Sequence, residues 1–113
     1  MPDILWHELK YFSRGDFDAP DELAPQLIRQ LEVSRSIAGI PFIITSDYRA
    51  GDDKSHGVGC AVDIRVSSGG ERMAIVRGLL KAGFRRIGVY DKHVHADIWK
   101  DGPTPVMWTG ISK

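Results

Sequence analysis

The sequence is short of cysteine, of long apolar runs and of any excess of charge. Its single cysteine, Cys60, can form no intrachain disulfide and cannot build a cage of thiolate zinc ligands. No apolar run approaches the ~18 residues that a membrane-spanning helix needs. Fifteen basic residues balance fifteen acidic ones, so bulk charge predicts neither a nucleic-acid partner nor an anionic membrane surface. Residues 1–8 contain no basic or long apolar region, so we expect no signal peptide and synthesis in a cytoplasm.

The 113 residues contain no internal repeat, low-complexity tract or linker, and their hydrophobic fraction of 42% is ordinary for a globular protein. We therefore expect one domain over residues 1–113, large enough to bury a core. Apolar spacing and turn residues predict these elements in order: a helix over 21–38, a strand over 41–45, a loop over 46–59, a strand over 61–66, a helix from 68 to 83, and a hairpin of 84–90 with 93–99.

Helix start and stop signals set the boundaries of the two helices. Pro25 is tolerated in a first turn, so the regular part of the first helix begins near it, and Gly39 fits the C-terminal cap. Ser68 and Glu71 form a capping box for the second helix, which ends at Gly83. The order of elements predicts an α+β fold with the helices packed on one small antiparallel sheet.

The tail after residue 100 is rich in glycine and proline and is predicted to be a loop. It carries Trp108. Large aromatic side chains in small domains are more often part of the core, so we expect Trp99 and Trp108 to be buried, with the lining of a glycan or peptide groove as the alternative. Cys60 is expected to be a small buried residue, and His7 to lie at the surface.

The most informative segment runs from His93 to Asp97 and alternates polar with apolar residues. On a strand, His93, His95 and Asp97 would lie on one face, and Val94 and Ala96 on the other. Imidazole and carboxylate groups are standard zinc ligands, and a His-x-His pair on a strand places both rings on the same side. This face is therefore a candidate metal site.

A second segment, 55–63, supplies further candidate ligands. His56 lies on a glycine-containing loop that leads into the strand carrying Asp63, which alternates with apolar neighbours. The two half-buried strands would then present polar groups on a common surface. The spacing leaves two ligand sets open: His56 and Asp63 together with a strand histidine, or the polar face of 93–97 alone with His56 as a helper.

Four segments carry a resemblance to a known family, and together they span most of the chain: Phe12–Asp18, Gly39–Arg49, Ser55–Asp63 and Val94–Asp97. They resemble the zinc D-alanyl-D-alanine carboxypeptidase and L-alanyl-D-glutamate peptidase family. These are peptidoglycan-cleaving metallopeptidases of bacteria and phages, and the Hedgehog signalling domain shares their fold. The most specific parts are His-x(6)-Asp followed by a distal histidine, with Ser-x-Tyr-Arg ahead of them.

The resemblance implies a ligand set and a catalytic arginine. By position, His56, Asp63 and His95 are similar to the three zinc ligands of the family. Arg49 resembles the arginine that orients the substrate and stabilises negative charge. Zinc lowers the pKa of a bound water to ~7, and a guanidinium suits a developing oxyanion or a carboxylate.

The chain departs from the family at the general base. Many members carry an acidic residue three positions before the last histidine ligand, where this chain has Lys92. We expect His93 and Asp97 to be the assisting groups, with Asp97 either orienting His95 or acting as the base itself. Asp91, one residue before Lys92, is the reserve candidate.

The resemblance implies a zinc-dependent peptidase whose partner is the peptidoglycan stem peptide. The scissile bond would be of the D-Ala-D-Ala or the L-Ala-D-Glu type. We expect an endolysin-like protein of a phage or prophage, made in the bacterial cytoplasm and acting on the cell wall after phage-mediated release. A non-catalytic zinc-stabilised binding module is the alternative, motivated by Lys92, and a phage structural component that binds the wall without cutting it is a third possibility.

Overall fold

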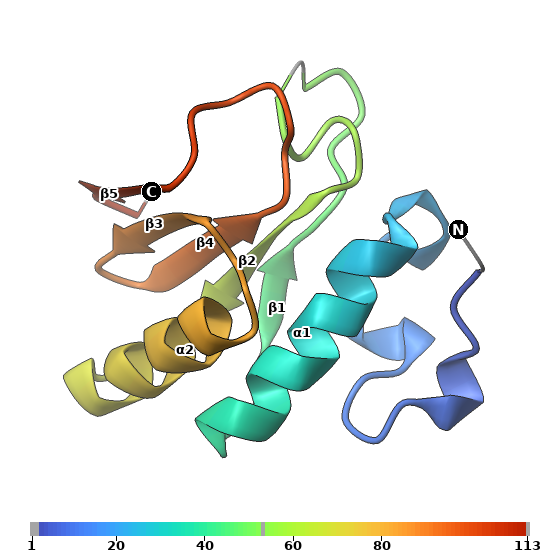
Figure 1. Cartoon of the computed structure of the whole chain (residues 1–113), viewed down its shortest axis with the longest axis horizontal. Coiled ribbons are helices and arrows are strands. Elements are labelled where there is room, and N and C mark those ends of the chain that lie inside the picture. Colours follow the sequence, from blue (N-terminus) through green and yellow to red (C-terminus); the bar gives the residue numbers. More distant parts are fainter. Residues whose placement is uncertain (1–2, 53, 113) are drawn as a thin grey trace.

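The structure is a computed structural model, and it describes residues 3–52 and 54–112. Over residues 3–24 the chain is mostly irregular, with three short 3-10 helices, Trp6–Glu8, Arg14–Asp16 and Pro20–Glu22. The remaining elements, in order, are α1 (Pro25–Ala38), β1 (Ile44–Ser46), β2 (Ala61–Arg65), α2 (Gly69–Lys81), β3 (Arg86–Tyr90), β4 (His93–Asp97) and β5 (Val106–Gly110). The expected α+β fold is therefore present, with two helices packed on one sheet (Figure 1).

The sheet is mixed, and this corrects the expectation of a purely antiparallel one. Its strand order is β1-β2-β4-β3-β5, with antiparallel pairs except for β3 and β5, which are parallel. The tail predicted to be a loop contains β5. The connection over 98–105 leaves β4 and crosses the end of β3, so β5 runs opposite to β4 and hence parallel to β3. This pairing joins segments that are far apart in the chain, so local turn residues cannot predict it.

Three of the four helix ends lie where they were predicted, and α2 ends at Lys81, two residues before Gly83. α1 begins at Pro25, and its C-cap Gly39 adopts the left-handed conformation with φ 74°. Ser68 caps α2 by accepting a hydrogen bond from the backbone N–H of Glu71 at 3.1 Å. These local signals determine where the helices start and stop, and tertiary packing supplies most of their stability.

The helices cover one face of the sheet, and the hydrophobic core lies between them and the strands (Figure 1). Alternate residues of the strands enter this core, including Val62 and Ile64 of β2 and Val94 and Ala96 of β4, each fully buried. Their polar neighbours must then lie on the opposite face, because side chains alternate along a strand. Within the described residues, no helix is long and apolar enough to cross a membrane.

Candidate metal centre

The polar face of the sheet arranges its side chains in rows, because β2, β4, β3 and β5 pair in register. One row contains Asp63, His95, Gly88 and Trp108, which are Cα partners across these four strands. Side chains that face each other in this way have Cβ atoms about 4.5–5.5 Å apart. The backbone pairing therefore sets Asp63 and His95 side by side.

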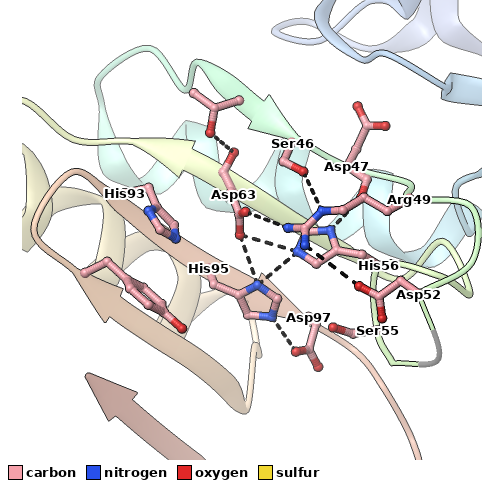
Figure 2. Close-up of polar contacts among 12 residues, drawn as sticks. Ser46, Asp47, Arg49, Asp52, Ser55, His56, Asp63, His93, His95 and Asp97 are labelled. Carbon is pink, nitrogen blue, oxygen red and sulfur yellow. Dashed lines mark hydrogen bonds and ion pairs between the residues drawn. The ribbon is translucent and has the colours of Figure 1, made fainter. Parts of the chain in front are cut away.

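His56 reaches the same place from the loop between β1 and β2 (Figure 2). The backbone N–H of Arg49 donates to the carbonyl of His56 at 3.1 Å, which closes the loop. Gly59 has φ 71°, and a Cβ there would overlap the carbonyl oxygen of Glu22. Only glycine meets both conditions, so the loop can pack against the N-terminal segment and hold His56 over the sheet.

Three potential ligand atoms form a small triangle. His56 Nε2 lies 3.3 Å from His95 Nδ1 and 3.5 Å from Asp63 Oδ1, and His95 Nδ1 lies 3.0 Å from Asp63 Oδ1. Tetrahedral zinc with bonds of about 2.0–2.1 Å separates two ligand atoms by about 3.3 Å. All three residues are buried, and the donor set can hold a metal ion.

The second nitrogen of each histidine is held by an oxygen. His56 Nδ1 lies 2.5 Å from the backbone oxygen of Asp47, which can only accept, so Nδ1 carries the hydrogen. His95 Nε2 lies 2.6 Å from Asp97 Oδ2. These partners leave His56 Nε2 and His95 Nδ1 facing the centre of the triangle. Such outer contacts fix the tautomer and the ring orientation of metal-binding histidines.

Asp97 and Arg86 form a buried pair behind His95. Asp97 is 1% exposed and accepts from Arg86 Nε at 2.7 Å and from the backbone N–H of Trp99 at 3.0 Å. Arg86 also donates to the carbonyl of Pro103 at 2.7 Å, and its guanidinium lies 5.4 Å from the ring of Trp99 and 5.3 Å from that of Trp108. The pair therefore ties β3, β4 and the loop after β4 together.

The ionisation of the cluster follows from its mutual contacts. Burial acts to raise the pKa of Asp63, but hydrogen bonds and charge from His56 and His95 outweigh it and hold that pKa well below its usual range. Burial acts to lower the pKa of His95, yet Asp63 and Asp97 raise it overall. The pKa of Asp97 is likewise lowered, against burial, chiefly by the hydrogen bond from His95. Both carboxylates are therefore ionised at neutral pH.

Arg49 extends to the triangle beside Asp63 and His56 (Figure 2). Its Nη2 lies 3.2 Å from Asp63 Oδ2, the oxygen that does not face the histidines, and its Nε donates to Ser46 Oγ at 3.1 Å. The side chain is half exposed. It can therefore hold the ligand carboxylate in place and still present N–H groups to a bound molecule.

The other candidate assisting groups occupy different positions. His93 stacks on Tyr90 with ring centroids 4.2 Å apart, and its Nδ1 lies 2.7 Å from Ser112 Oγ. Asp91 is exposed, and its carboxylate accepts the backbone N–H of Ser112 at 2.6 Å. Lys92 is exposed in the same turn. Contacts with Ser112 therefore hold the turn between β3 and β4 in place.

A cavity of about 660 Å³ opens over the polar face. Among the predicted site residues, those that line it are Arg49, His56, Asp63, His93, His95 and Asp97. Asp91 is not among its lining residues. In the part of the chain that the structure describes, the cluster able to hold a metal consists of His56, Asp63 and His95, so the alternative set on 93–97 alone is not brought together.

The two tryptophans line the cavity too, so the expectation that they belong to the core is wrong. Trp99 and Trp108 are half-buried, because their rings cover the Arg86 guanidinium on the polar face instead of entering the apolar layer. Cys60 is buried and His7 is exposed, as expected.

Three contributors to the site were missed from the sequence: Arg86, Tyr90 and Asp47. Arg86 carried little signal, because it is the first residue of β3 and directly follows another arginine, Arg85. Tyr90 and Asp47 carried none, because their roles depend on contacts across the sheet and with the N-terminal segment.

In comparisons with protein-family models, with curated proteins and with solved structures, no match to this chain was found.

Proposed function

We propose that this protein is a zinc-dependent metallopeptidase that hydrolyses peptide bonds in peptidoglycan stem peptides. The carrying observation is the triangle of His56 Nε2, Asp63 Oδ1 and His95 Nδ1, which has the dimensions of a zinc site and borders a cavity large enough for a peptide. A site with three protein ligands and an open fourth position is the arrangement of catalytic zinc. The choice of peptidoglycan, of a Hedgehog-like fold and of a phage endolysin context rests on the resemblance of the four sequence segments.

Each residue of the site has a role in this proposal. Zinc at the triangle would supply a polarised water near neutral pH. Asp97 orients His95, since its oxygens already accept hydrogen bonds from His95 and Arg86. Arg49 holds Asp63 and binds a negatively charged group of the substrate. His93, fixed at Nδ1 by Ser112, exchanges a proton with the reacting groups through Nε2.

The test combines metal content with cleavage. The purified protein is loaded with zinc, freed of excess metal and incubated with purified peptidoglycan, and products are separated and identified by mass spectrometry. We expect one zinc per chain, and either released D-alanine or a new free amino group on D-glutamate. The His95→Ala variant should lose both zinc and cleavage. The His7→Ala variant, altered at an exposed histidine outside the cavity, should keep both.

One observation favours a second candidate, a non-catalytic zinc-stabilised module that binds the wall. Of the carboxylates that line the cavity, Asp63 and Asp97 are engaged by the histidines, and Asp52 lies 3.8 Å from Arg49 and accepts the backbone N–H of Lys54. Each carboxylate that the structure describes in the cavity therefore already has a partner. A zinc-loaded protein that sediments with peptidoglycan and releases no product would support this module and refute the peptidase.

A further inference from the structure

Arg49 contacts residues of β1 and β2, whereas the part of the cavity over the other three strands is lined by Tyr90, His93 and Trp108. These residues come from β3, β4 and β5. The ring of Tyr90 stacks on His93, and the ring of Trp108 lies 5.4 Å from that of His95. We call this group the aromatic wall. It borders the metal triangle directly through His95.

Two glycines make room for the aromatic wall. Gly88 lies between His95 and Trp108 in the row across the sheet, and a Cβ there would be 2.5 Å from Trp108 Nε1 and 2.9 Å from Tyr90 Cε2. A Cβ at Gly110 would overlap the ring of Tyr90. The rings of Tyr90 and Trp108 therefore lie over positions without side chains. Because Gly88 is the direct cross-strand partner of His95, the edge of the Tyr90 ring that lies over Gly88 is on the side of His95.

The direction of one hydrogen bond determines what the phenol can do. Trp108 Nε1 donates to the hydroxyl oxygen of Tyr90 at 3.0 Å, and an indole N–H can only donate. The hydroxyl oxygen is therefore an acceptor in this bond, and its own hydrogen remains to be donated. Among the described residues, no protein group accepts this hydrogen. A molecule bound in the cavity, which Tyr90 lines, could supply an acceptor for this hydrogen.

We propose that the Tyr90 hydroxyl, oriented by Trp108, donates a hydrogen bond to the carbonyl oxygen of the scissile bond as that oxygen gains negative charge. This inference rests on the proposed peptidase function and adds a catalytic residue to it. Tyr90 complements Arg49, which is already paired with Asp63. A donor held in place before the reaction stabilises such charge without rearrangement, and removal of one typically costs ~10²–10³-fold in kcat.

The variant Tyr90→Phe keeps the ring and its stacking on His93 and removes only the hydroxyl. With purified peptidoglycan as substrate, we expect kcat to fall about 100-fold while KM changes less than about threefold. Zinc content should stay at the wild-type value, and Tm should fall only slightly, because Trp108 Nε1 loses its acceptor. Phosphinate analogues of the two candidate dipeptides, whose tetrahedral oxygens imitate the charged carbonyl, should bind about 100-fold more weakly to this variant. The matched control Tyr11→Phe, whose ring lies against Arg35 outside the cavity, should show none of these changes.

A second variant tests the orienting bond. Trp108→Phe removes the N–H that directs the Tyr90 hydroxyl, and we expect a smaller loss in kcat than for Tyr90→Phe. The inference is overturned if Tyr90→Phe retains kcat within threefold, or if KM rises and kcat does not change. Wild-type protein that cleaves nothing overturns the proposed function and this inference with it. Wild-type cleavage with an unaffected Tyr90→Phe variant overturns the inference alone.

Discussion

Asp47 connects the N-terminal segment to the candidate metal centre, and its replacement by alanine gives a strong test of the structure. The residue follows β1 and is 1% exposed. Its carboxylate accepts three backbone N–H groups, those of Asp18 at 2.7 Å, Ala19 at 3.2 Å and Tyr48 at 2.6 Å. Its backbone oxygen holds Nδ1 of His56. Removal of the carboxylate should therefore release the N-terminal segment from the loop that carries a ligand.

The expected magnitude follows from these bonds. A hydrogen bond to a charged group contributes about 1.5–3 kcal/mol net. The bond to Tyr48 is local, so we count only the two to Asp18 and Ala19, and because Asp18 is exposed to water we take the low end for each. Asp47→Ala then lowers the free energy of unfolding by about 3 kcal/mol. At about 4 °C per kcal/mol for a chain of this size, Tm falls by about 12 °C.

Unfolding of the metal-free protein in urea and on heating, followed by circular dichroism, gives both numbers. Hydrogen exchange adds a local readout, since the amides of Asp18 and Ala19 should lose protection in Asp47→Ala well before the strands do. Asp101→Ala, at an exposed carboxylate, is the matched control and should change stability by less than about 0.5 kcal/mol. A loss below about 1 kcal/mol in Asp47→Ala, with unchanged exchange at both amides, would refute the reasoning.

Two further predictions concern ionisation. In the metal-free protein Asp63 and Asp97 raise the pKa of His95 above 6.5 against the effect of burial, so its contribution to stability is fully present below pH 6.5 and is lost as pH rises through the raised value. Tm of the metal-free protein, measured by scanning fluorimetry, should fall from pH 6 towards pH 9, and a flat or rising Tm would contradict the assignment. Burial, and then the charge of Asp97, raise the pKa of the Cys60 thiol to about 11. At pH 8 the native protein should react with a disulfide reagent at least ~100-fold more slowly than the unfolded chain, and rapid native labelling would count against the placement of Cys60.

Local patterns were sufficient for much of the fold. Strict alternation over residues 93–97 identified a strand with one polar face, and proline, serine and glycine at the helix ends fixed both helices. Such signals work because they depend on the backbone near each residue. β5 depends instead on a partner strand distant in sequence, and the prolines before it favour a loop when that partner is unknown. The mixed sheet could not be inferred for the same reason.

The residues of the candidate site also differ in how well the sequence predicts them. His56, Asp63 and His95 were identifiable because their spacing and residue types are specific, and the structure brings them to one point. Asp47 and Arg86 were not, since a buried charged residue looks like a surface residue until its partners are known. Asp47 accepts hydrogen bonds from backbone amides that lie earlier in the chain. Arg86 bonds to Asp97 only because β3 pairs with β4.

When both histidines are neutral, the charges around the triangle are balanced. The carboxylates of Asp63 and Asp97 are each paired with an arginine, Asp63 with Arg49 and Asp97 with Arg86. If His56 and His95 bind a metal as neutral imidazoles, these four charges cancel, and a divalent ion adds its full charge to the site. The cluster is poorly exposed to water, so that charge is weakly screened. With a divalent ion bound, such a centre would favour hydroxide over water and negatively charged substrate groups over neutral ones. Asp97→Asn should therefore impair metal binding less than Asp63→Asn, because Asp97 would act through His95 and Asp63 would itself be a ligand. A competition measurement of the zinc Kd of the two variants tests that order.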